Sequence, residues 1–132
     1  MVRSERAVKL ADRVAIVTGG SKGIGLGCAR TFASYGCKVV IAARGEEAGL
    51  AAEAELKHAG HEVLFVRCDV TVEDDMRELI DGTVDRHGRL DCLVNNAGWH
   101  PGAVKIDDVS IADFESLLRL NLTSTFTCSS RT

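Results

Sequence analysis

The amino-acid sequence predicts an α/β fold: a doubly wound parallel sheet of about four strands, closed by the helix that follows them. Two observations support this fold class. Short runs rich in Val, Ile and Leu alternate with longer segments whose apolar residues recur at helical spacing. Such short, continuous apolar runs are typical of parallel strands that are covered on both faces. With short connections and one proline, Pro101, the 132 residues are expected to form one domain with right-handed crossovers.

The elements follow in order along the chain. Strands are predicted over 14–17, 38–43, 63–66 and 92–94. Helices are predicted over about 26–35, 48–60, 76–88 and 110–126. Gly60 and Gly88 are expected to end the second and third helices, because glycine readily adopts the left-handed conformation of a helix C-terminus. Thr71 or a neighbour is expected to cap the third helix, with acidic residues in its first turn.

Composition narrows the class of protein. Apolar residues make up 45% of the chain and charged residues 27%, as in ordinary globular proteins. The net charge of -3 gives no support for a nucleic-acid partner, and no apolar run approaches the roughly 20 residues that span a membrane. The five cysteines form no C-x-x-C pair, so we expect free, largely buried thiols and a cytoplasmic location. No spacing of His with Cys or His suggests a metal site, and the histidines are expected to be solvated.

The sequence from Thr18 to Gly25, T-G-G-S-K-G-I-G, lies between the first strand and the first helix. Gly19 would allow a tight turn out of the strand. Gly23 and Gly25 would let the backbone approach a pyrophosphate and let the helix pack close to the sheet. The free N–H groups at the start of the helix would then face the phosphates. This context predicts a dinucleotide-binding loop on a Rossmann-type sheet.

The spacing T-G-x-x-x-G-x-G resembles the short-chain dehydrogenase/reductase family, in its single-domain branch. Asp69-Val70 after the third strand resembles the family's adenine-contacting segment, and Asn95-Asn96-Ala97-Gly98 resembles its N-N-A-G motif. Asn121 resembles the Asn that helps organise a proton-relay water, so it is the catalytic residue that the resemblance implies. The implied cofactor-binding residues are Gly19, Ser21, Lys22, Gly23, Ile24, Gly25, Arg44, Asp69, Val70, Asn95, Ala97 and Gly98.

The resemblance implies hydride transfer between NAD(P) and a small-molecule alcohol or carbonyl. The segments 88–94 and 99–101 are similar to the 17-beta-hydroxysteroid dehydrogenase type 14 branch, which implies a steroid-like substrate and NAD. The residues at the end of the second strand and in the glycine loop instead favour NADP as the cofactor. Ala43 stands where NAD-selective members carry an acid, and Arg44 and Lys22 suit a 2′-phosphate. We therefore expect NADP, with NAD possible; the alternative is that both cations are solvated surface charges.

The family's catalytic Tyr and the Lys four residues after it have no counterpart in this sequence. The single tyrosine, Tyr35, is followed four residues later by Val39, and Ser129 and Ser130 are poor candidates for the catalytic Ser. We therefore expect an N-terminal half that is inactive alone and marginally folded, with an exposed edge on the fourth strand. The complete protein is expected to be a homo-oligomer.

Two other functions remain open. The chain could be a nucleotide-binding or dimer-interfering fragment without catalysis. Another Rossmann enzyme, such as a methyltransferase or a nucleotide-sugar enzyme, is disfavoured by the N-N-A-G motif and by the glycine spacing.

Overall fold

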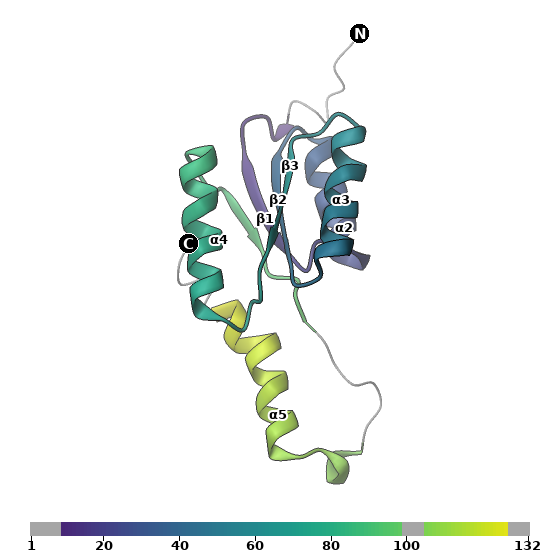
Figure 1. The fold of residues 1–132 in the computed structure, drawn as a ribbon, viewed down its shortest axis with the longest axis vertical. Helices are drawn as coiled ribbons and strands as arrows, with labels where there is room; N and C mark the ends of the chain where they lie inside the picture. The colour runs from purple at the N-terminus through teal and green to yellow at the C-terminus, as the bar shows by residue number, and fades with distance from the viewer. Residues whose placement is uncertain (1–8, 99–104, 127–132) are drawn as a thin grey trace.

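The computed structural model describes residues 9–98 and 105–126. Its centre is a parallel four-stranded sheet with the order β3-β2-β1-β4 (Figure 1). The strands are β1 (Val14–Thr18), β2 (Lys38–Ala43), β3 (Val63–Arg67) and β4 (Cys92–Val94). All four predicted strands and the parallel α/β class are therefore confirmed, with β1 and β3 each one residue longer than expected.

Helices cover both faces of the sheet. Helices α2 (Gly23–Ser34) and α3 (Glu46–His58) lie on one face, and α4 (Glu73–His87) lies on the other (Figure 1). The apolar residues of each strand alternate between two buried clusters, one beneath α2 and α3 and one beneath α4. Ile16 and Ile41 are both fully buried but belong to different clusters. A sheet buried on both faces explains why its strands are continuous apolar runs in the sequence.

The helices begin one to three residues away from the predicted starts. Helix α2 begins at Gly23 rather than Leu26, so its first turn belongs to the glycine loop. The residue before α4 is Val72, and no side chain caps that helix. The expectation of a side-chain cap from Thr71 or a neighbour is therefore wrong: the N-cap is the apolar Val72, and the Thr71 hydroxyl donates to the Asp69 carboxylate. The predicted helix ends hold: Gly60 and Gly88 have φ values of 90° and 78°.

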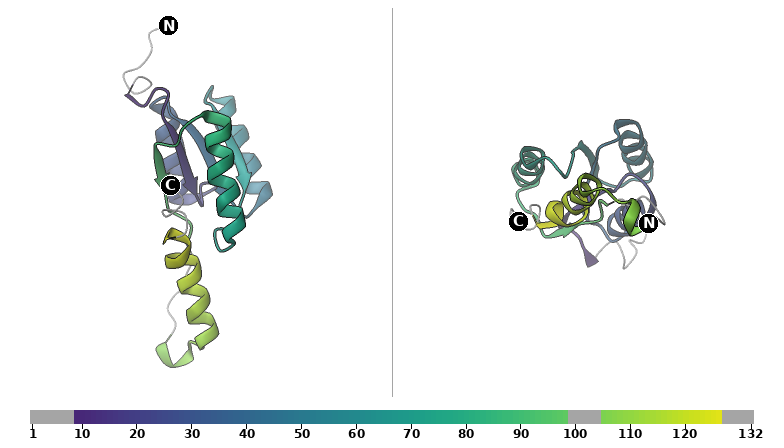
Figure 2. Two further views of the ribbon diagram at one scale, coloured as in Figure 1. Left: turned by 90° about the vertical axis from the view of Figure 1, so that its left-hand side faces the viewer. Right: turned by 90° about the horizontal axis from the view of Figure 1, so that it is seen from below.

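The last helical segment extends away from the sheet. A 3₁₀ turn, η1 (Ile106–Asp108), precedes α5 (Ile111–Leu118), whose start is capped by the Ser110 hydroxyl. The helix continues through a π-helical stretch, η2 (Arg119–Thr123). Its final turns lie at the carboxyl edge of the sheet, and α5 projects outward from there (Figure 2).

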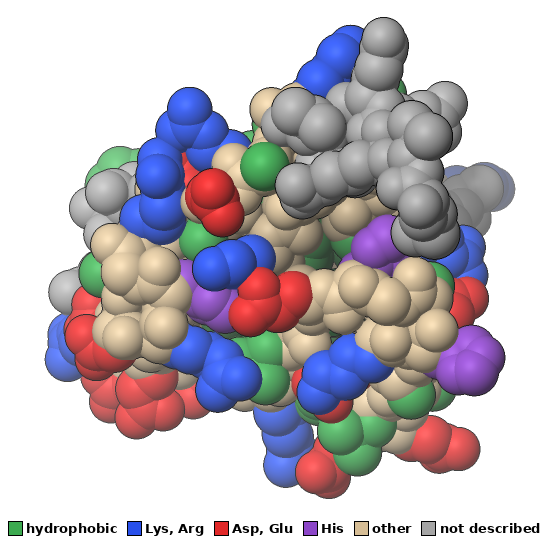
Figure 3. All heavy atoms as spheres, turned by 90° about the horizontal axis from the view of Figure 1, so that it is seen from above, with side chains coloured by type: hydrophobic (Ala, Val, Ile, Leu, Met, Phe, Trp, Pro, Cys, Tyr) green, Lys and Arg blue, Asp and Glu red, His purple; other side chains and the backbone are tan. Residues whose placement is uncertain are grey.

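The exposed amino edge of the sheet carries mixed charge. Figure 3 looks onto this end, where cationic and anionic side chains are interspersed over the coloured surface. Ion pairs here join Lys38 to Glu62 and join both Arg13 and Arg89 to Asp91. Within residues 9–98 and 105–126, none of the helices combines the length and apolar content that crossing a membrane would take.

Candidate nucleotide-binding site

The glycine loop adopts backbone conformations that side chains would oppose. Gly19 has a φ of 64°, and its N–H donates to the carbonyl of Ala42 at 2.8 Å, which holds the loop against the end of β2. Gly23 has a φ of 59°, and a Cβ added there would meet nothing within 4 Å. Glycine adopts such positive φ values at no steric cost. At Gly23 the loop is therefore both left-handed and open to a ligand.

Gly25 is required for a different reason, which is close packing. A Cβ at this position would overlap the carbonyl oxygen of Gly19 and lie 2.5 Å from the amide nitrogen of Asn96. Gly25 is buried, and it is the point where α2 passes over the loop and over the turn after β4. Only a residue without a side chain permits this approach.

Thr18 joins the loop to the turn that follows β4. Its buried hydroxyl donates to the carbonyl of Val94 at 3.2 Å. The same oxygen accepts from the backbone N–H groups of Asn96 and Ala97, at 3.0 and 3.1 Å. The side-chain amide of Asn96 in turn donates a hydrogen bond to the carbonyl oxygen of Gly19. The sequence reasoning did not single out Thr18 or Asn96 as site residues, although their places in the two motifs were a signal for both.

The start of α2 is electrostatically suited to an anion. Within this fully described helix, the first turn contains no acidic residue and Lys22 at its N-cap makes no side-chain capping bond. By contrast, the first turns of α3 and α4 carry acidic side chains: Glu46, Glu47, Glu73, Asp74 and Asp75. The partial positive charge of a helix N-terminus favours an anion, and here no carboxylate of the first turn competes for it.

A cleft of about 490 Å³ lies at the carboxyl edge of the sheet beside this helix start. Seven residues expected from the sequence line it: Gly19, Ser21, Lys22, Arg44, Val70, Ala97 and Gly98. The wall is completed by Ala42, Ala43, Gly45, Ala48, Cys68 and Leu120. Loops after β1, β2, β3 and β4 thus meet at one cleft. Ligands of open α/β sheets bind at such a carboxyl edge.

Other expected residues lie beside the cleft rather than in its wall. Gly23 and Gly25 belong to the loop and its helix. The side chain of Ile24 is 80% exposed, and Asn95 is exposed as well. Both side chains are thus exposed in the structure without a ligand, and their contact with the cofactor stays a prediction.

Asp69 lies in an adjoining cavity of about 730 Å³, which shares Arg44 and Gly45 with the cleft. Its carboxylate accepts from the Thr71 hydroxyl at 2.6 Å and from the Thr71 N–H at 2.9 Å. These hydrogen bonds, the hydroxyl bond first, lower the pKa of Asp69, and partial burial opposes them. Arg44 adds a weak ion pair at 3.8 Å while 73% of its own side chain stays exposed. Asp69 is thus held charged beside Arg44.

Asn121 reaches the site from the far end of the described chain. It lies in the π-helical stretch η2, and such stretches occur frequently at functional sites. Its amide nitrogen donates to the carbonyl of Leu117 at 3.0 Å. Its side-chain oxygen lies 2.5 Å from where a Cβ on Gly98 would be. With Leu120 in the cleft wall, η2 brings Asn121 against the N-N-A-G turn.

The remaining candidates lie elsewhere. Tyr35 ends α2, and Cys28, Cys37, Cys68 and Cys92 are free thiols that are buried or partly buried. His87 departs from the expected solvated histidine because its buried Nε2 has no hydrogen-bond partner among the described residues. Trp99, His100, Pro101, Cys128, Ser129 and Ser130 lie outside the described residues. Within the described ranges, no group of three or more His, Cys, Asp or Glu is arranged to hold a metal.

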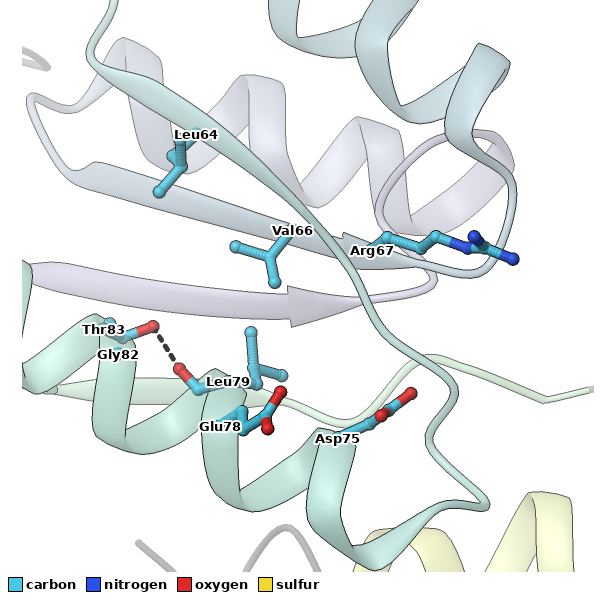
Figure 4. A pocket seen from close by; sticks show the side chains of 8 residues that line it. All are labelled: Leu64, Val66, Arg67, Asp75, Glu78, Leu79, Gly82 and Thr83. Atoms are coloured by element: carbon cyan, nitrogen blue, oxygen red, sulfur yellow. Dashed lines mark hydrogen bonds between the residues drawn. The ribbon is translucent and has the colours of Figure 1, made fainter.

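A second cleft, of about 320 Å³, lies between β3 and α4 (Figure 4). Leu64, Val66 and Leu79 face one another in this cleft, Glu78 lies beside Leu79, and Arg67 and Asp75 lie at one end. It contains none of the residues expected from the sequence to bind a nucleotide. The glycine-loop cleft is therefore the better candidate site, because the chemistry-bearing residues converge there.

Comparisons with known proteins agree with this arrangement. The family model described as "short chain dehydrogenase" matches residues 13–132. The chain is 47% identical to L-fucose dehydrogenase of Oryctolagus cuniculus over 119 residues, covering 90% of this chain and 40% of that protein. It is 41% identical to an uncharacterized oxidoreductase of Thermotoga maritima, covering 91% of this chain and 46% of that protein.

A solved structure is similar as well. The crystal structure of a short chain dehydrogenase from Mycobacterium smegmatis matches with a TM-score of 0.89 and 33% identity. The match covers 94% of this chain and 52% of that one. The chain thus spans roughly two fifths of the length of its similar curated relatives and about half of this solved chain.

Proposed function

Since this chain belongs to the short chain dehydrogenase family, we propose that it holds NADP(H) in the glycine-loop cleft as part of an oxidoreductase. The reaction is hydride transfer between the nicotinamide and an alcohol or carbonyl carbon of a small molecule. The observation that carries the proposal is the convergence of the glycine loop, the N-N-A-G turn and Asn121 on one cleft.

The residues present fit a dinucleotide. The left-handed Gly23 leaves open space where a Cβ would stand, and the first turn of α2 offers N–H groups without a nearby carboxylate. Lys22 and Ser21 line the same cleft and would complete the contacts to the phosphates. When bound, the dinucleotide supplies or accepts the hydride. The chain's own task is to fix its orientation, through Gly19, Ala97 and Gly98 in the cleft wall.

The cofactor proposed first is NADP(H). Ala43 provides no carboxylate for a ribose 2′-hydroxyl, whereas Arg44 can bind a 2′-phosphate with two parallel hydrogen bonds. The weak Arg44–Asp69 ion pair, at 3.8 Å on an exposed side chain, is an interaction that a phosphate could replace. NAD(H) is the alternative if Arg44 stays with Asp69.

Asn121 is proposed as the catalytic residue that this chain contributes. Its carboxamide lies against Gly98, at the end of the cleft formed by the turn after β4. A carboxamide can both donate to and accept from a water molecule, and π-helical stretches occur frequently at functional sites. We propose that this water belongs to the proton relay of the complete active site.

The substrate class is proposed from two sources. The relatives named L-fucose dehydrogenase favour the hydroxyl group of a sugar. The resemblance to the 17-beta-hydroxysteroid dehydrogenase type 14 branch, which stays a prediction, favours a steroid-like alcohol. In either case the carbon that carries the hydroxyl group would give a hydride to the nicotinamide, so the same hydride chemistry serves both.

The alternative function is nucleotide binding without turnover. Tyr35, the single tyrosine, ends α2, and Val39 rather than Lys stands four residues after it. Tyr35 therefore lacks the Lys partner that the resemblance implies for the catalytic Tyr. We propose that these 132 residues bind nucleotide and require a Tyr/Lys pair from outside this sequence to use it.

Location and assembly are proposed on two further observations. Burial raises the pKa of the Cys37 thiol to about 11, so this thiol stays protonated and unreactive, as suits a cytoplasmic protein. Five large apolar side chains of the last helical segment are exposed: Ile111, Phe114, Leu118, Leu122 and Phe126. We propose that a second copy covers this face in the complete protein, which makes it a homo-oligomer.

The experiment has two readouts on the 132-residue chain. Calorimetric titration with NADPH and NADH measures binding, and absorbance at the nicotinamide band measures NADPH oxidation over a carbonyl panel. NADP⁺ reduction is followed with L-fucose and with a hydroxysteroid. We expect NADPH to bind without turnover. Turnover would contradict the fragment reading, and absence of any binding would contradict the proposed function itself.

A further inference from the structure

We propose that Arg67 is a second cationic contact for the 2′-phosphate, so that selectivity for NADP(H) depends on the pair Arg44 and Arg67. This inference rests on the proposed function, because it assigns a residue to the same cofactor. The sequence alone predicts no role for Arg67, because this residue lies at the end of β3 and outside the motifs of the family.

The register of the sheet brings Arg67 to the required place. Arg67 is the last residue of β3 and pairs with Ala43, the last residue of β2. Paired residues of neighbouring parallel strands direct their side chains to the same face of the sheet. Phe65 and Ile41, two residues earlier on each strand, both pack in the cluster under α2 and α3. Arg67 is therefore the lateral neighbour of Ala43, the position where NAD-selective members carry their acid.

A cavity connects Arg67 to the cofactor cleft. The space of about 730 Å³ is lined by Arg44, Gly45, Arg67, Asp69 and Asp75, and it shares Arg44 and Gly45 with the glycine-loop cleft. In Figure 4 the Arg67 side chain runs toward the carboxyl ends of the strands, away from Leu64 and Thr83. Arg44 and Arg67 thus both line one space at the end of β2, and Arg67 also lines the cleft between β3 and α4.

The charges in this cavity leave Arg67 as the cation available to a ligand. Asp69 is occupied by Thr71 and by Arg44, and Asp75 accepts a hydrogen bond from the Asp69 N–H at 3.0 Å. Arg67 is exposed and forms no ion pair within the described parts of the chain. Its guanidinium can therefore turn to a phosphate without breaking an existing interaction.

A second cation is also what the local charge requires. Arg44 is paired with Asp69, and the first turn of α3 carries the exposed acids Glu46 and Glu47. With Asp75 in the cavity wall as well, one guanidinium among four carboxylates is a poor site for a phosphate of charge near -2. Two guanidiniums, each able to form two parallel hydrogen bonds, offset that repulsion.

The test compares NADPH and NADH binding to four forms of the 132-residue chain by calorimetry: wild type, Arg67→Gln, Arg67→Lys and Arg86→Gln. Arg86 is an exposed cation near the end of α4, at the opposite edge of the sheet, and serves as the charge-matched control. We expect Arg67→Gln to weaken NADPH binding at least about tenfold and NADH binding less than about twofold. Arg67→Lys should fall between, and Arg86→Gln should match wild type. Circular dichroism verifies that each variant is folded.

The outcomes separate this inference from the proposed function. If Arg67→Gln leaves the affinity for NADPH unchanged, or weakens the affinities for NADPH and NADH equally, the role of Arg67 is overturned. The assignment of the cleft as a nucleotide site is then unaffected. A wild type that prefers NADH overturns the inference and the choice of NADP, but not the dinucleotide site. A wild type that binds neither nucleotide overturns both.

Discussion

The side-chain amide of Asn96 donates a hydrogen bond to the carbonyl oxygen of Gly19 at 3.2 Å, across 77 positions of sequence. This bond fixes the glycine loop against the turn after β4, and α2 passes over the same point at Gly25. The glycine-loop cleft is therefore one unit built from two distant motifs. Changes in either motif should affect both folding stability and nucleotide binding.

Thr18→Val tests the hydroxyl at the centre of this unit. Valine keeps the shape but leaves the N–H groups of Asn96 and Ala97 without their acceptor. We expect unfolding free energy to fall by about 1–3 kcal/mol, with weaker NADPH binding. Urea unfolding and calorimetry measure the two effects. Thr31→Val is the control, since Thr31 is exposed and bonds only within its helix, to Gly27. An equal loss in both variants would refute the special role of Thr18.

Gly25→Ala and Gly27→Ala form a matched pair on α2. The methyl group at position 25 would overlap the Gly19 carbonyl, whereas a Cβ at Gly27 meets nothing within 4 Å. We expect Gly25→Ala to destabilise by about 1–3 kcal/mol and to abolish nucleotide binding. Gly27→Ala should instead stabilise by about 0.5–1 kcal/mol, because alanine is the better helix former. Thermal unfolding with and without NADPH measures both effects. If Gly25→Ala bound NADPH as tightly as wild type, the close packing at Gly25 would not be needed for binding.

Asp91 should make stability depend on acid pH. Hydrogen bonds from Arg89, then from the Val14 N–H and Arg13, lower the pKa of Asp91 from 3.8 to about 2. A carboxylate whose pKa is lower in the folded state than in the unfolded state stabilises the fold at every pH above the unfolded-state pKa. That stabilisation is lost as pH falls from about 4 to 2. Asp91→Asn should therefore be less stable than wild type at pH 7, and most of this difference should be lost as pH falls from about 4 to about 2. Urea midpoints across this range test it, with Asp85→Asn, at an exposed position of α4, as the control.

His87 should make folding stability depend on pH in a higher range, just below neutrality. Burial, first among several causes, lowers the pKa of His87 below 6.5, and its Nε2 has no partner in the described structure. The unfolded chain therefore binds a proton more readily, so stability present above pH 6.5 is lost as pH falls below it. His87→Leu should flatten the stability profile between pH 7 and 5, as thermal midpoints would record. His58→Leu, at an exposed position of α3, should leave the slope unchanged.

The sheet and the nucleotide loop could be predicted because their physics is local. Strands covered on both faces must be apolar throughout, so β1 to β4 stand out as short runs between helical segments. The positive φ values at Gly19 and Gly23 likewise follow from a residue type that tolerates them. The short chain dehydrogenase family could be recognised for the same reason, since its motifs lie at the ends of these strands.

Other features depend on contacts that no local pattern encodes. Thr71 is a residue type that often caps helices, but its hydroxyl donates a hydrogen bond to the carboxylate of Asp69, two residues earlier. The Leu and Phe pattern of α5 predicts a helix with an apolar face, yet says nothing about whether that face meets the sheet. The roles of Asn96 and Arg67 follow from a hydrogen bond and a strand register that join separate segments.

The most direct test of the central claim is an amide-resolved NMR titration of the ¹⁵N-labelled chain with NADPH. If the glycine-loop cleft holds the nucleotide, the amide signals of Gly19, Ser21, Gly23 and Gly98 shift together, while those of Gly60 and Gly88 at the amino edge stay in place. Shifts centred instead on Leu64 and Thr83 in the cleft between β3 and α4, or no shifts at all, would contradict the assignment of the glycine-loop cleft as the nucleotide site.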